Sequence, residues 1–416
     1  MPKATNLIGA YNNFVVEPLK TEEELKDFYV ERPKNAPSPI EELRDRIEYA
    51  ESAKKYLFLG FRGCGKSTEL NRLFQLLDKD RFLLVSYSIR ELDVSDFDFR
   101  DFFGSMALKI YDIAEKEIKL EKDIKEDFLG FMMHITRVSE EDVTKYREMG
   151  ISFSNFILLK LGREAKTREY IRKELETKIS DLIQKLNWLT MEVETKSSKR
   201  IVVIVDDLDK LTRVGQAEDF FYKNYGLLIQ PNCFVIYTFP IPLTFNPYYE
   251  NVRPAFDDDI ILPQLPVKSK DGKRLNEKNI NFYKGIVEKR MDLDLIEENA
   301  LEEAIVSTGK TSEFISIMRD AAIKAYRIGR EKITIEEVGK ALEKLRRTYD
   351  RTLTEAHKKR LLEIYDTKEA RDDDISDSTS RDLLFSLTAV EYEDEEGRWC
   401  DINSLLKPLV EKWKKA

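Results

Sequence analysis

The sequence is poor in the residues that bind metal ions and form disulfides. Its 416 residues include three cysteines, Cys64, Cys233 and Cys400, far apart along the chain, and two histidines, His134 and His357. A structural zinc site needs several such residues at close spacing, so we expect no dedicated zinc site. Three separated cysteines also suit a protein whose thiols stay reduced in the cytosol.

The sequence also lacks long apolar runs and an excess of positive charge. No segment approaches the ~20 apolar residues that a membrane-spanning helix needs, and the first residues, MPKATNLIGAYNNF, have no basic stretch followed by an apolar run. We therefore expect a cytoplasmic protein without a membrane partner. The net charge of −9 argues against attraction of nucleic acid over the whole surface, although a local basic patch is compatible with it.

Charge of both signs and apolar residues are plentiful. Charged residues make up 35 % of the chain and hydrophobic residues 42 %, which allows large cores under a surface that suits helices. A length of 416 residues corresponds to two or three domains of about 100–200 residues each.

Short apolar runs that alternate with helical segments predict an α/β fold with a parallel sheet. The runs are YLFLG (56–60), RFLLVSYSI (81–89), RIVVIVDDLDKL (200–211) and NCFVIYTFPIPL (232–243). Five consecutive Ile or Val residues in the third run are typical of a central strand covered on both faces.

A long, mostly helical insertion separates the second and third runs. We expect helices at 97–118 and 165–194 and, from the early alternation in ISFSNFILLKLG, a hairpin at 151–162. Farther on, a linker is expected at 268–274, helices from 279 to 349, and a hairpin around the EDEEG turn, followed by a final amphipathic helix.

The stretch FLGFRGCGKSTEL contains the pattern Gly60-x-x-x-x-Gly65-Lys66-Ser67 between an expected strand and an expected helix. Glycines let the backbone N–H groups surround phosphate, and the helix N-terminus favours the anion. The motif predicts ATP binding, with Lys66 at the β- and γ-phosphates and Ser67 on Mg²⁺. The predicted nucleotide-binding residues are Gly60, Arg62, Gly63, Cys64, Gly65, Lys66, Ser67 and Thr68.

A pair of acids, Asp206 and Asp207, ends the third strand. Asp206 is predicted to hold Mg²⁺ together with Ser67, and Asp207 to orient or deprotonate the attacking water. Asp209 is interpreted as a local cap or a contact to a neighbour. Thr238 ends the next strand, where its hydroxyl could contact water or the γ-phosphate, or simply cap the strand.

A phosphoryl-transfer site gains from an added cation. The candidates are Arg213, Arg253, Arg290 and Arg319. Each of them taken singly is more often an ordinary surface arginine.

Together these motifs resemble the P-loop ATPases of the AAA+/STAND group, near their origin-recognition and signal-transduction branches. GFRGCGKST is similar to Walker A, IVVIVDDLD to Walker B with a second Asp, and CFVIYT to the sensor-1 strand. VSTGKTSEFISIMRDAAIKAY resembles the lid helix, and the C-terminal region resembles a winged helix. The resemblance covers roughly 37–416 and implies antiviral defence as a context.

The resemblance divides the chain into four parts. These are an N-terminal arm (1–36), a P-loop ATPase domain (37–268) with its helical insertion at about 95–198, a helical lid domain (269–350) and a winged-helix domain (351–416).

Two departures from the family pattern favour a nucleotide-gated switch over a fast motor. The lid stretch that begins Gly309-Lys310 lacks the arginine that contacts the γ-phosphate in many relatives, so that Lys310 or Arg319 would have to replace it. Asp207 stands where motors usually carry glutamate, and the shorter side chain suits slow turnover.

The predicted function is therefore a Mg²⁺-dependent ATPase switch that controls assembly with itself or with an effector protein. A DNA-bound loader that uses the basic run from Lys344 to Arg360 is the less favoured alternative, because acids accompany that run and five carboxylates lie in the wing. A scaffold that binds ATP without hydrolysing it is the other alternative.

Overall fold

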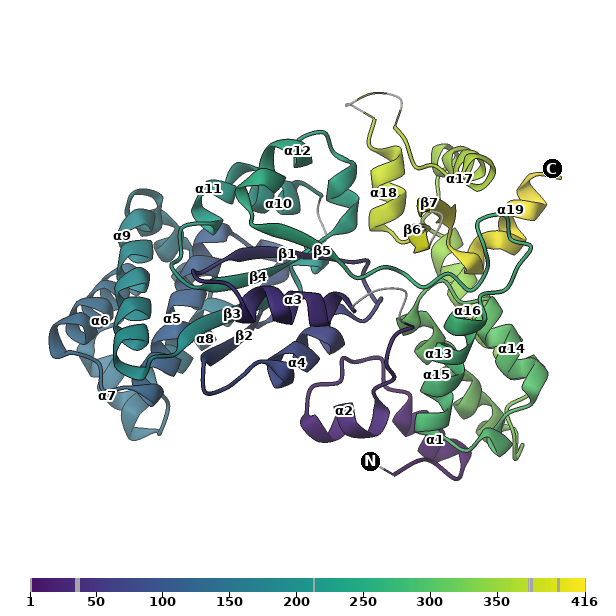
Figure 1. The fold of residues 1–416 in the computed structure, drawn as a ribbon, viewed down its shortest axis with the longest axis horizontal. Helices are drawn as coiled ribbons and strands as arrows, with labels where there is room; N and C mark the ends of the chain where they lie inside the picture. The colour runs from purple at the N-terminus through teal and green to yellow at the C-terminus, as the bar shows by residue number, and fades with distance from the viewer. Residues whose placement is uncertain are drawn as a thin grey trace.

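The computed structural model of the chain describes residues 2–33, 38–211, 214–372, 374, 377–394 and 397–415. A central sheet lies between the helical insertion at one end of the molecule and the lid and winged-helix parts at the other (Figure 1). The chain crosses between these ends more than once, because the N-terminal helices lie beside the lid (Figure 1).

The sheet has five parallel strands in the order β2-β3-β4-β1-β5. Their bounds are β1 Lys55–Leu59, β2 Phe82–Ser88, β3 Arg200–Asp206, β4 Phe234–Phe239 and β5 Asp258–Ile261. The first four confirm the predicted strands. The edge strand β5 was missed because two aspartates open its four residues and hide the apolar signal.

Helices cover both faces of the sheet, as the uninterrupted apolar runs predicted. Successive side chains of a strand point to opposite faces. Val202 and Ile204 pack in one core with α3 (Pro39–Glu48) and α4 (Lys66–Leu76). Val203 and Val205 of the same strand pack in a second core with the insertion.

The helical insertion, residues 97–198, comprises α5 Phe99–Glu117, α6 Lys122–Thr136, α7 Glu140–Glu148, α8 Phe153–Arg163 and α9 Ala165–Ser197. Helices α5 and α9 confirm two predictions, but the predicted hairpin at 151–162 is wrong. Ser152 caps a helix there, and Phe156, Ile157 and Leu161 are buried. Packing of α8 against α5 and α9 overrides the weak strand propensity of this sequence. Among the residues that the structure describes, no helix is both long and apolar enough to cross a membrane.

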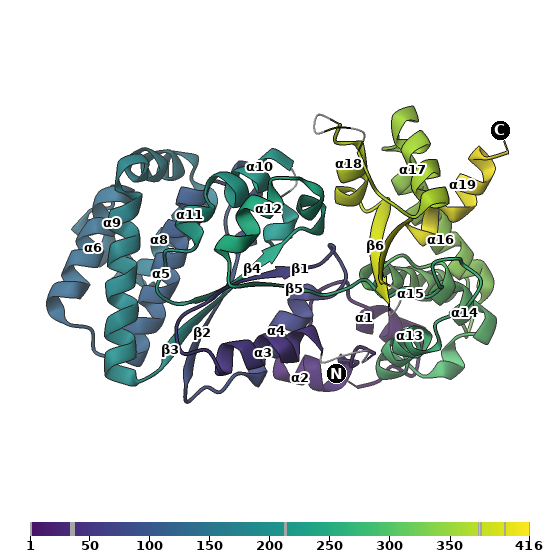
Figure 2. The same cartoon turned by 45° about the horizontal axis from the view of Figure 1, so that its top comes forward.

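Short elements connect the ends of β3, β4 and β5. They are η3 Leu208–Lys210, α10 Val214–Glu218, the π-helical turn η4 Asp219–Lys223, α11 Tyr225–Leu228, η5 Ile241–Phe245 and α12 Tyr249–Val252. Helices α10, α11 and α12 lie on the side of the sheet opposite α3 and α4 (Figure 2).

The lid consists of α13 Glu277–Arg290, α14 Glu298–Val306, α15 Thr311–Arg327 and α16 Ile335–Asp350. The N-terminal arm contributes α1 (Leu7–Asn13) and α2 (Glu22–Phe28). Ala10 and Phe14 are fully buried in the lid core, so the arm precedes the sheet in sequence but packs on the lid in space.

The C-terminal part contains α17 Glu355–Thr367, α18 Thr379–Phe385, β6 Ala389–Asp394, β7 Gly397–Ile402 and α19 Lys407–Trp413. Strands β6 and β7 pair as the predicted antiparallel hairpin. Helix α18 packs against η5, and Gln264 of the linker forms a bridge with Tyr392 of β6. The winged helix therefore rests on the ATPase domain (Figure 2).

Candidate functional site

The predicted site residues meet where four parallel strands end. In the sheet register Ser88 of β2 lies opposite Asp206 of β3, and Thr238 of β4 lies opposite Phe58 of β1. The glycine loop that follows β1 lies at the same edge. Ligands of open α/β sheets bind at this edge, beyond the carboxyl ends of the strands.

The loop between β1 and α4 has a backbone that requires glycine. Gly63 has φ +85° and Gly65 has φ +108°, and both values are unfavourable for other residues. Gly65 is also the N-cap of α4, so the first N–H groups of that helix face the loop. Cys64 points inward, with its Sγ 3.9 Å from the Leu262 carbonyl oxygen.

Lys66 is 4 % exposed and uses all three of its ammonium hydrogens within the protein. Its Nζ donates to the carbonyls of Gly60 and Phe61, at 2.7 and 2.9 Å, and to Oδ2 of Asp209 at 2.9 Å. Burial by itself would lower the pKa of Lys66, but the Asp209 carboxylate outweighs it, so that the pKa is raised. Lys66 is therefore a fully charged, prepositioned cation.

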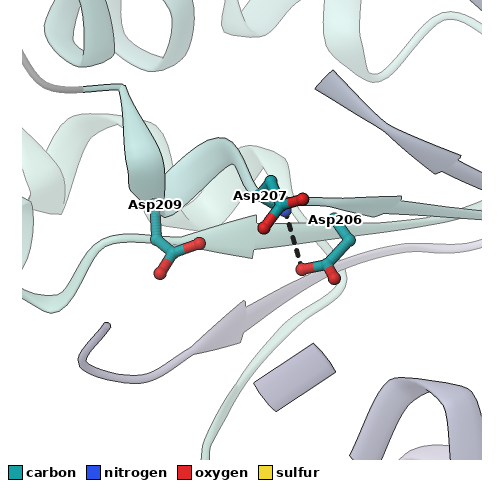
Figure 3. Close-up of side chains that lie close together, drawn as sticks. All are labelled: Asp206, Asp207 and Asp209. Atoms are coloured by element: carbon teal, nitrogen blue, oxygen red, sulfur yellow. Dashed lines mark hydrogen bonds between the residues drawn. The ribbon is translucent and has the colours of Figure 1, made fainter. Parts of the chain in front are cut away.

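Asp206 and Ser67 lie next to each other, as predicted for a magnesium site. Burial, together with the nearby Asp207 and Asp209 carboxylates, raises the pKa of Asp206 to about 6, and a hydrogen bond with Ser67 opposes that rise. Asp206, Asp207 and Asp209 offer carboxylate oxygens within 4.8 Å of one another. Figure 3 shows the three side chains at the end of β3, with the Asp207 N–H donating to Asp206.

Asp207 is engaged by several polar partners through its carboxylate. Its backbone has φ +69°, which turns the side chain toward β2. Its carboxylate accepts a hydrogen bond of 2.5 Å from the Ser88 hydroxyl, pairs with Lys210, and lies 3.6 Å from Nε of Arg90. Its role as a general base stays a prediction and requires the carboxylate to turn.

Asp209 is a site residue that the sequence interpretation missed. Instead of capping locally or contacting a neighbour, it is 6 % exposed and pairs with Lys66 across 143 positions of sequence. Burial opposes its charge, but Lys66 lowers the pKa of Asp209 below its ordinary value, so this carboxylate stays ionised. Its position three residues after Asp206 was the available signal, because one 3₁₀ turn brings it back to the strand end.

Thr238 is fully buried, and its hydroxyl binds groups of the fold. The oxygen accepts from the Leu208 N–H at 3.0 Å and donates to the Val205 carbonyl at 3.2 Å. The hydroxyl thus fastens β4 to the turn that carries Asp207 and Asp209. The geometry gives Thr238 a positioning role, and direct contact with substrate stays a prediction.

The loop forms one wall of an open cleft of about 250 Å³. The arm provides Val16, Glu17 and Pro18, the glycine loop and α4 provide Arg62, Gly63, Gly65, Lys66, Ser67 and Thr68, the strand ends provide Arg90, Asp209 and Lys210, and the lid provides Thr311, Ser312 and Ile315. We call this the nucleotide cleft. It has charged walls at the strand ends and partly apolar walls at the arm and lid.

Hydrogen bonds join the three walls. The Leu19 N–H of the arm donates to the Thr68 hydroxyl at 3.2 Å, and Asn71 of α4 donates back to the Leu19 carbonyl at 2.9 Å. The Ser312 N–H of the lid donates to the Gly63 carbonyl at 3.0 Å. The arm's part in the site was not predicted, because its sequence carries no motif.

The three arginine candidates that the structure describes do not line the cleft. Arg290 is buried against the Phe28 carbonyl, Arg319 lies over the ring of Tyr11, and Arg253 pairs with Asp259. Arg213 lies outside the described residues.

Lys310, proposed as a substitute for the missing lid arginine, also points elsewhere. It is 8 % exposed and contacts Tyr349 at 3.1 Å and Glu313 at 3.4 Å. Instead, Arg62, Arg90 and Lys210 are the cations that join Lys66 in the cleft.

The residues present fit a nucleoside triphosphate with Mg²⁺. A Cβ on Gly60 would lie 2.9 Å from Cδ of Lys66, so a larger residue at position 60 would displace the lysine side chain. Asp206 and the neighbouring Ser67 offer the oxygen ligands that Mg²⁺ prefers, and the cations of the cleft suit phosphate.

Comparison with known proteins supports this conclusion for the centre of the chain. Residues 59–218 match the KAP family P-loop domain. No match was found among curated proteins.

Among solved structures, the chain is similar to the Aeropyrum pernix ORC1 protein in complex with DNA, with 14 % identity, coverage of 95 % of this chain and 97 % of that chain, and a TM-score of 0.41. It is similar to Cdc6p from Pyrobaculum aerophilum, with 13 % identity, coverage of 94 % and 98 %, and a TM-score of 0.36. It is also similar to the Thermotoga maritima RuvB Holliday junction branch migration motor, with 13 % identity, coverage of 95 % and 98 %, and a TM-score of 0.37.

The glycine loop, the acids at the end of β3 and the family match agree. Both site features lie within residues 59–218, the segment that matches the KAP family P-loop domain.

Proposed function

We propose that this protein is a Mg²⁺-dependent ATPase switch in which bound nucleotide joins the arm, the P-loop domain and the lid. The observation that carries the proposal is the make-up of the nucleotide cleft, to which all three parts contribute walls. A ligand that contacts all three walls stabilises one arrangement of them relative to others, which is what a population-shifting switch requires.

Phosphate binding is assigned to the glycine loop. The N–H groups at the start of α4 and the ammonium of Lys66 would face the phosphates. Ser67 and Asp206 would hold Mg²⁺, which supplies charge neutralisation on the phosphates. The side chains of Val16, Pro18 and Ile315 offer apolar surface for the base at the arm and lid.

A buried cluster of polar residues connects the lid to the winged helix. Glu313 accepts from the Gly309 N–H at 3.2 Å, from the Tyr349 hydroxyl, and from the Asn403 amide at 3.2 Å. Asn403 belongs to the winged-helix part and is fully buried. Because Ser312 of the same helix binds the glycine loop, α15 connects the winged helix to the nucleotide cleft.

Hydrolysis is proposed to be slow. Asp207, the predicted base, is engaged by Ser88 and Lys210 and has to leave these partners before it can accept a proton from water. The output of the switch is proposed to be assembly with further copies or with an effector protein. The antiviral context stays a prediction.

DNA loading remains the second candidate, but specific contacts speak against it. In helix-turn-helix domains the second helix enters the groove, and here that helix, α18, packs on η5 of the ATPase domain. Part of the basic run is also paired within the fold, since Lys344 pairs with Asp320 and Arg347 with Glu343.

Measurements of ATP binding and of molar mass test the proposal. Lys66→Ala should abolish ATP binding, whereas Lys116→Ala, which changes an exposed lysine of α5, should bind as the wild type does. Molar mass by light scattering should change with ATP for the wild type and not for Lys66→Ala. A mass that is independent of ATP in both proteins would refute the assembly step.

Phosphate release separates a switch from a scaffold. We expect slow release by the wild type and loss of at least tenfold in Asp207→Asn, because an amide cannot accept the proton. Equal background traces for the two proteins would show a scaffold that binds ATP without hydrolysing it.

A further inference from the structure

Arg90 lies in the nucleotide cleft, and its side chain makes few contacts with the rest of the protein. It lines the cleft with Lys66 and Lys210, and its side chain is 62 % exposed. The one ion pair that the structure shows for it, to Asp207, spans 3.6 Å. By contrast, Lys66 forms a hydrogen-bonded ion pair with Asp209, and Lys210 forms one with Asp207.

Contacts with neighbouring elements hold the backbone that carries Arg90. The Ser88 hydroxyl accepts from the Arg90 N–H at 3.2 Å, and the neighbouring Ile89 is fully buried. The carboxylate of Glu91 pairs with Lys109 of α5 at 2.6 Å. A Cβ on Gly162 of α8 would lie 2.7 Å from the Glu91 carbonyl oxygen, so the insertion packs directly against this segment.

A planar guanidinium binds phosphate oxygens with two parallel hydrogen bonds. One additional arginine, supplied in cis or in trans, stabilises the charge that develops in phosphoryl transfer and raises the rate by ~10³–10⁵-fold in known NTPases. The arginines named from the sequence and described by the structure face away from the cleft, as shown above. Two other arginines line the cleft, Arg62 in the glycine loop and Arg90 after β2. Of these two, Arg90 is the one beside the predicted base, with its Nε 3.6 Å from the Asp207 carboxylate.

We propose that Arg90 is the cation that contacts the terminal phosphate of bound ATP, and that the helical insertion positions it. The proposal rests on the ATPase switch proposed above and adds the residue that distinguishes ATP from ADP. When ATP is bound, Arg90 leaves Asp207 and donates to γ-phosphate oxygens, which also releases one partner of the predicted base. A displacement of α8 or α5 would move Glu91 and, with it, the neighbouring Arg90. A partner that binds the insertion would regulate turnover in this way.

Affinities for Mg-ATP and Mg-ADP, measured by calorimetry, test the contact without relying on turnover. Arg90→Ala should weaken ATP binding about tenfold, the loss of one charged hydrogen-bond pair, and change ADP binding less than twofold. Arg90→Lys should lie between, because lysine keeps the charge but not the bidentate geometry. Arg44→Ala, which removes a partly exposed arginine of α3 paired with Asp45, is the matched control and should change neither affinity.

The alternative is that Arg90 acts only by holding Asp207. In that case Arg90→Ala would have no further effect on the ratio of ATP to ADP affinity in an Asp207→Asn background, and this result would overturn the proposal. An unchanged ratio in the single variant would overturn it as well. If the wild type releases no phosphate but Arg90→Ala still loses ATP selectivity, the hydrolysis step fails and the Arg90 contact stands.

The positioning role of the insertion is tested with paired glycines. Gly162→Ala should displace the Glu91 segment and lower phosphate release at least tenfold, with ADP affinity retained. Gly130→Ala in α6, where a Cβ meets no atom within 4 Å, should release phosphate as the wild type does. Equal rates for Gly162→Ala and Gly130→Ala would show that the insertion does not position Arg90.

Discussion

The ion pair between Lys66 and Asp209 competes with phosphate for the P-loop lysine. Lys66 has three N–H donors, and all three are engaged by Gly60, Phe61 and Asp209. To bind a phosphate oxygen, the lysine has to give up at least one of them. The variant Asp209→Asn keeps the shape of the side chain and an acceptor oxygen but removes the competing negative charge.

The magnitudes follow from the geometry. At 2.9 Å, Coulomb's law with an effective dielectric constant of about 20 gives a gross attraction of about 6 kcal/mol. Desolvation offsets much of this, and breaking one side of a buried pair costs ~3–5 kcal/mol. Because Gly60 and Phe61 still accept from Lys66, we expect Asp209→Asn to lower the free energy of unfolding without nucleotide by about 3 kcal/mol, the lower end of that range.

Nucleotide affinity should move in the opposite direction. A hydrogen bond to a charged group stabilises by about 1–1.5 kcal/mol more than one to a neutral group. The free-energy cost of releasing Lys66 from residue 209 is therefore lower by that amount in Asp209→Asn. We therefore expect Asp209→Asn to bind Mg-ADP about tenfold more tightly than the wild type. The stability gap between the two proteins should shrink at saturating ADP, by linkage.

Thermal unfolding with and without Mg-ADP, combined with calorimetric titration, measures both effects. Asp112→Asn, which alters a pair on α5 with an exposed lysine, is the control and should cost less than about 1 kcal/mol. Weaker ADP binding by Asp209→Asn, with an equal loss of stability in the presence and absence of ADP, would refute the competition between Asp209 and phosphate.

Three further predictions concern the surroundings of the site. Thr238→Val should lower the free energy of unfolding by about 1–3 kcal/mol, since two backbone groups lose their partner, while Thr238→Ser should stay near the wild type in denaturant unfolding. Gly309→Ala should weaken the contact between lid and winged helix, because the new Cβ would lie 2.2 Å from Asn403 Oδ1. Limited proteolysis should then cut faster between these two parts. Gly339→Ala, where a Cβ meets no atom within 4 Å, should be cut as the wild type is. Burial raises the pKa of Asp101 to about 6 despite its pair with Arg172. Since this lies above the unfolded value of 3.8, the folded state binds the proton more tightly than the unfolded state. Wild-type stability should therefore fall relative to Asp101→Asn by about 2 kcal/mol from pH 4 to pH 6.

Local sequence was sufficient for the parts of the fold whose signal is short-range. The runs that became β1 to β4 are continuously apolar because both of their faces are buried, and the glycine loop needs positive φ at two positions that the motif itself specifies. The prediction of a hairpin at 151–162 was wrong because the apolar residues of this segment fit a strand or a helix, and packing on α5 favours the helix.

The sequence by itself determined that a P-loop domain exists and which loop, strand end and helix form it, because those groups are contiguous in the chain. Only the tertiary structure decided which side chains face the nucleotide cleft. Asp209 meets Lys66, Arg90 reaches the cleft from β2, and the arm reaches it from the N-terminus, each across a long sequence separation. The order of strands in the sheet and the packing of arm and lid set these encounters, and no local pattern encodes them.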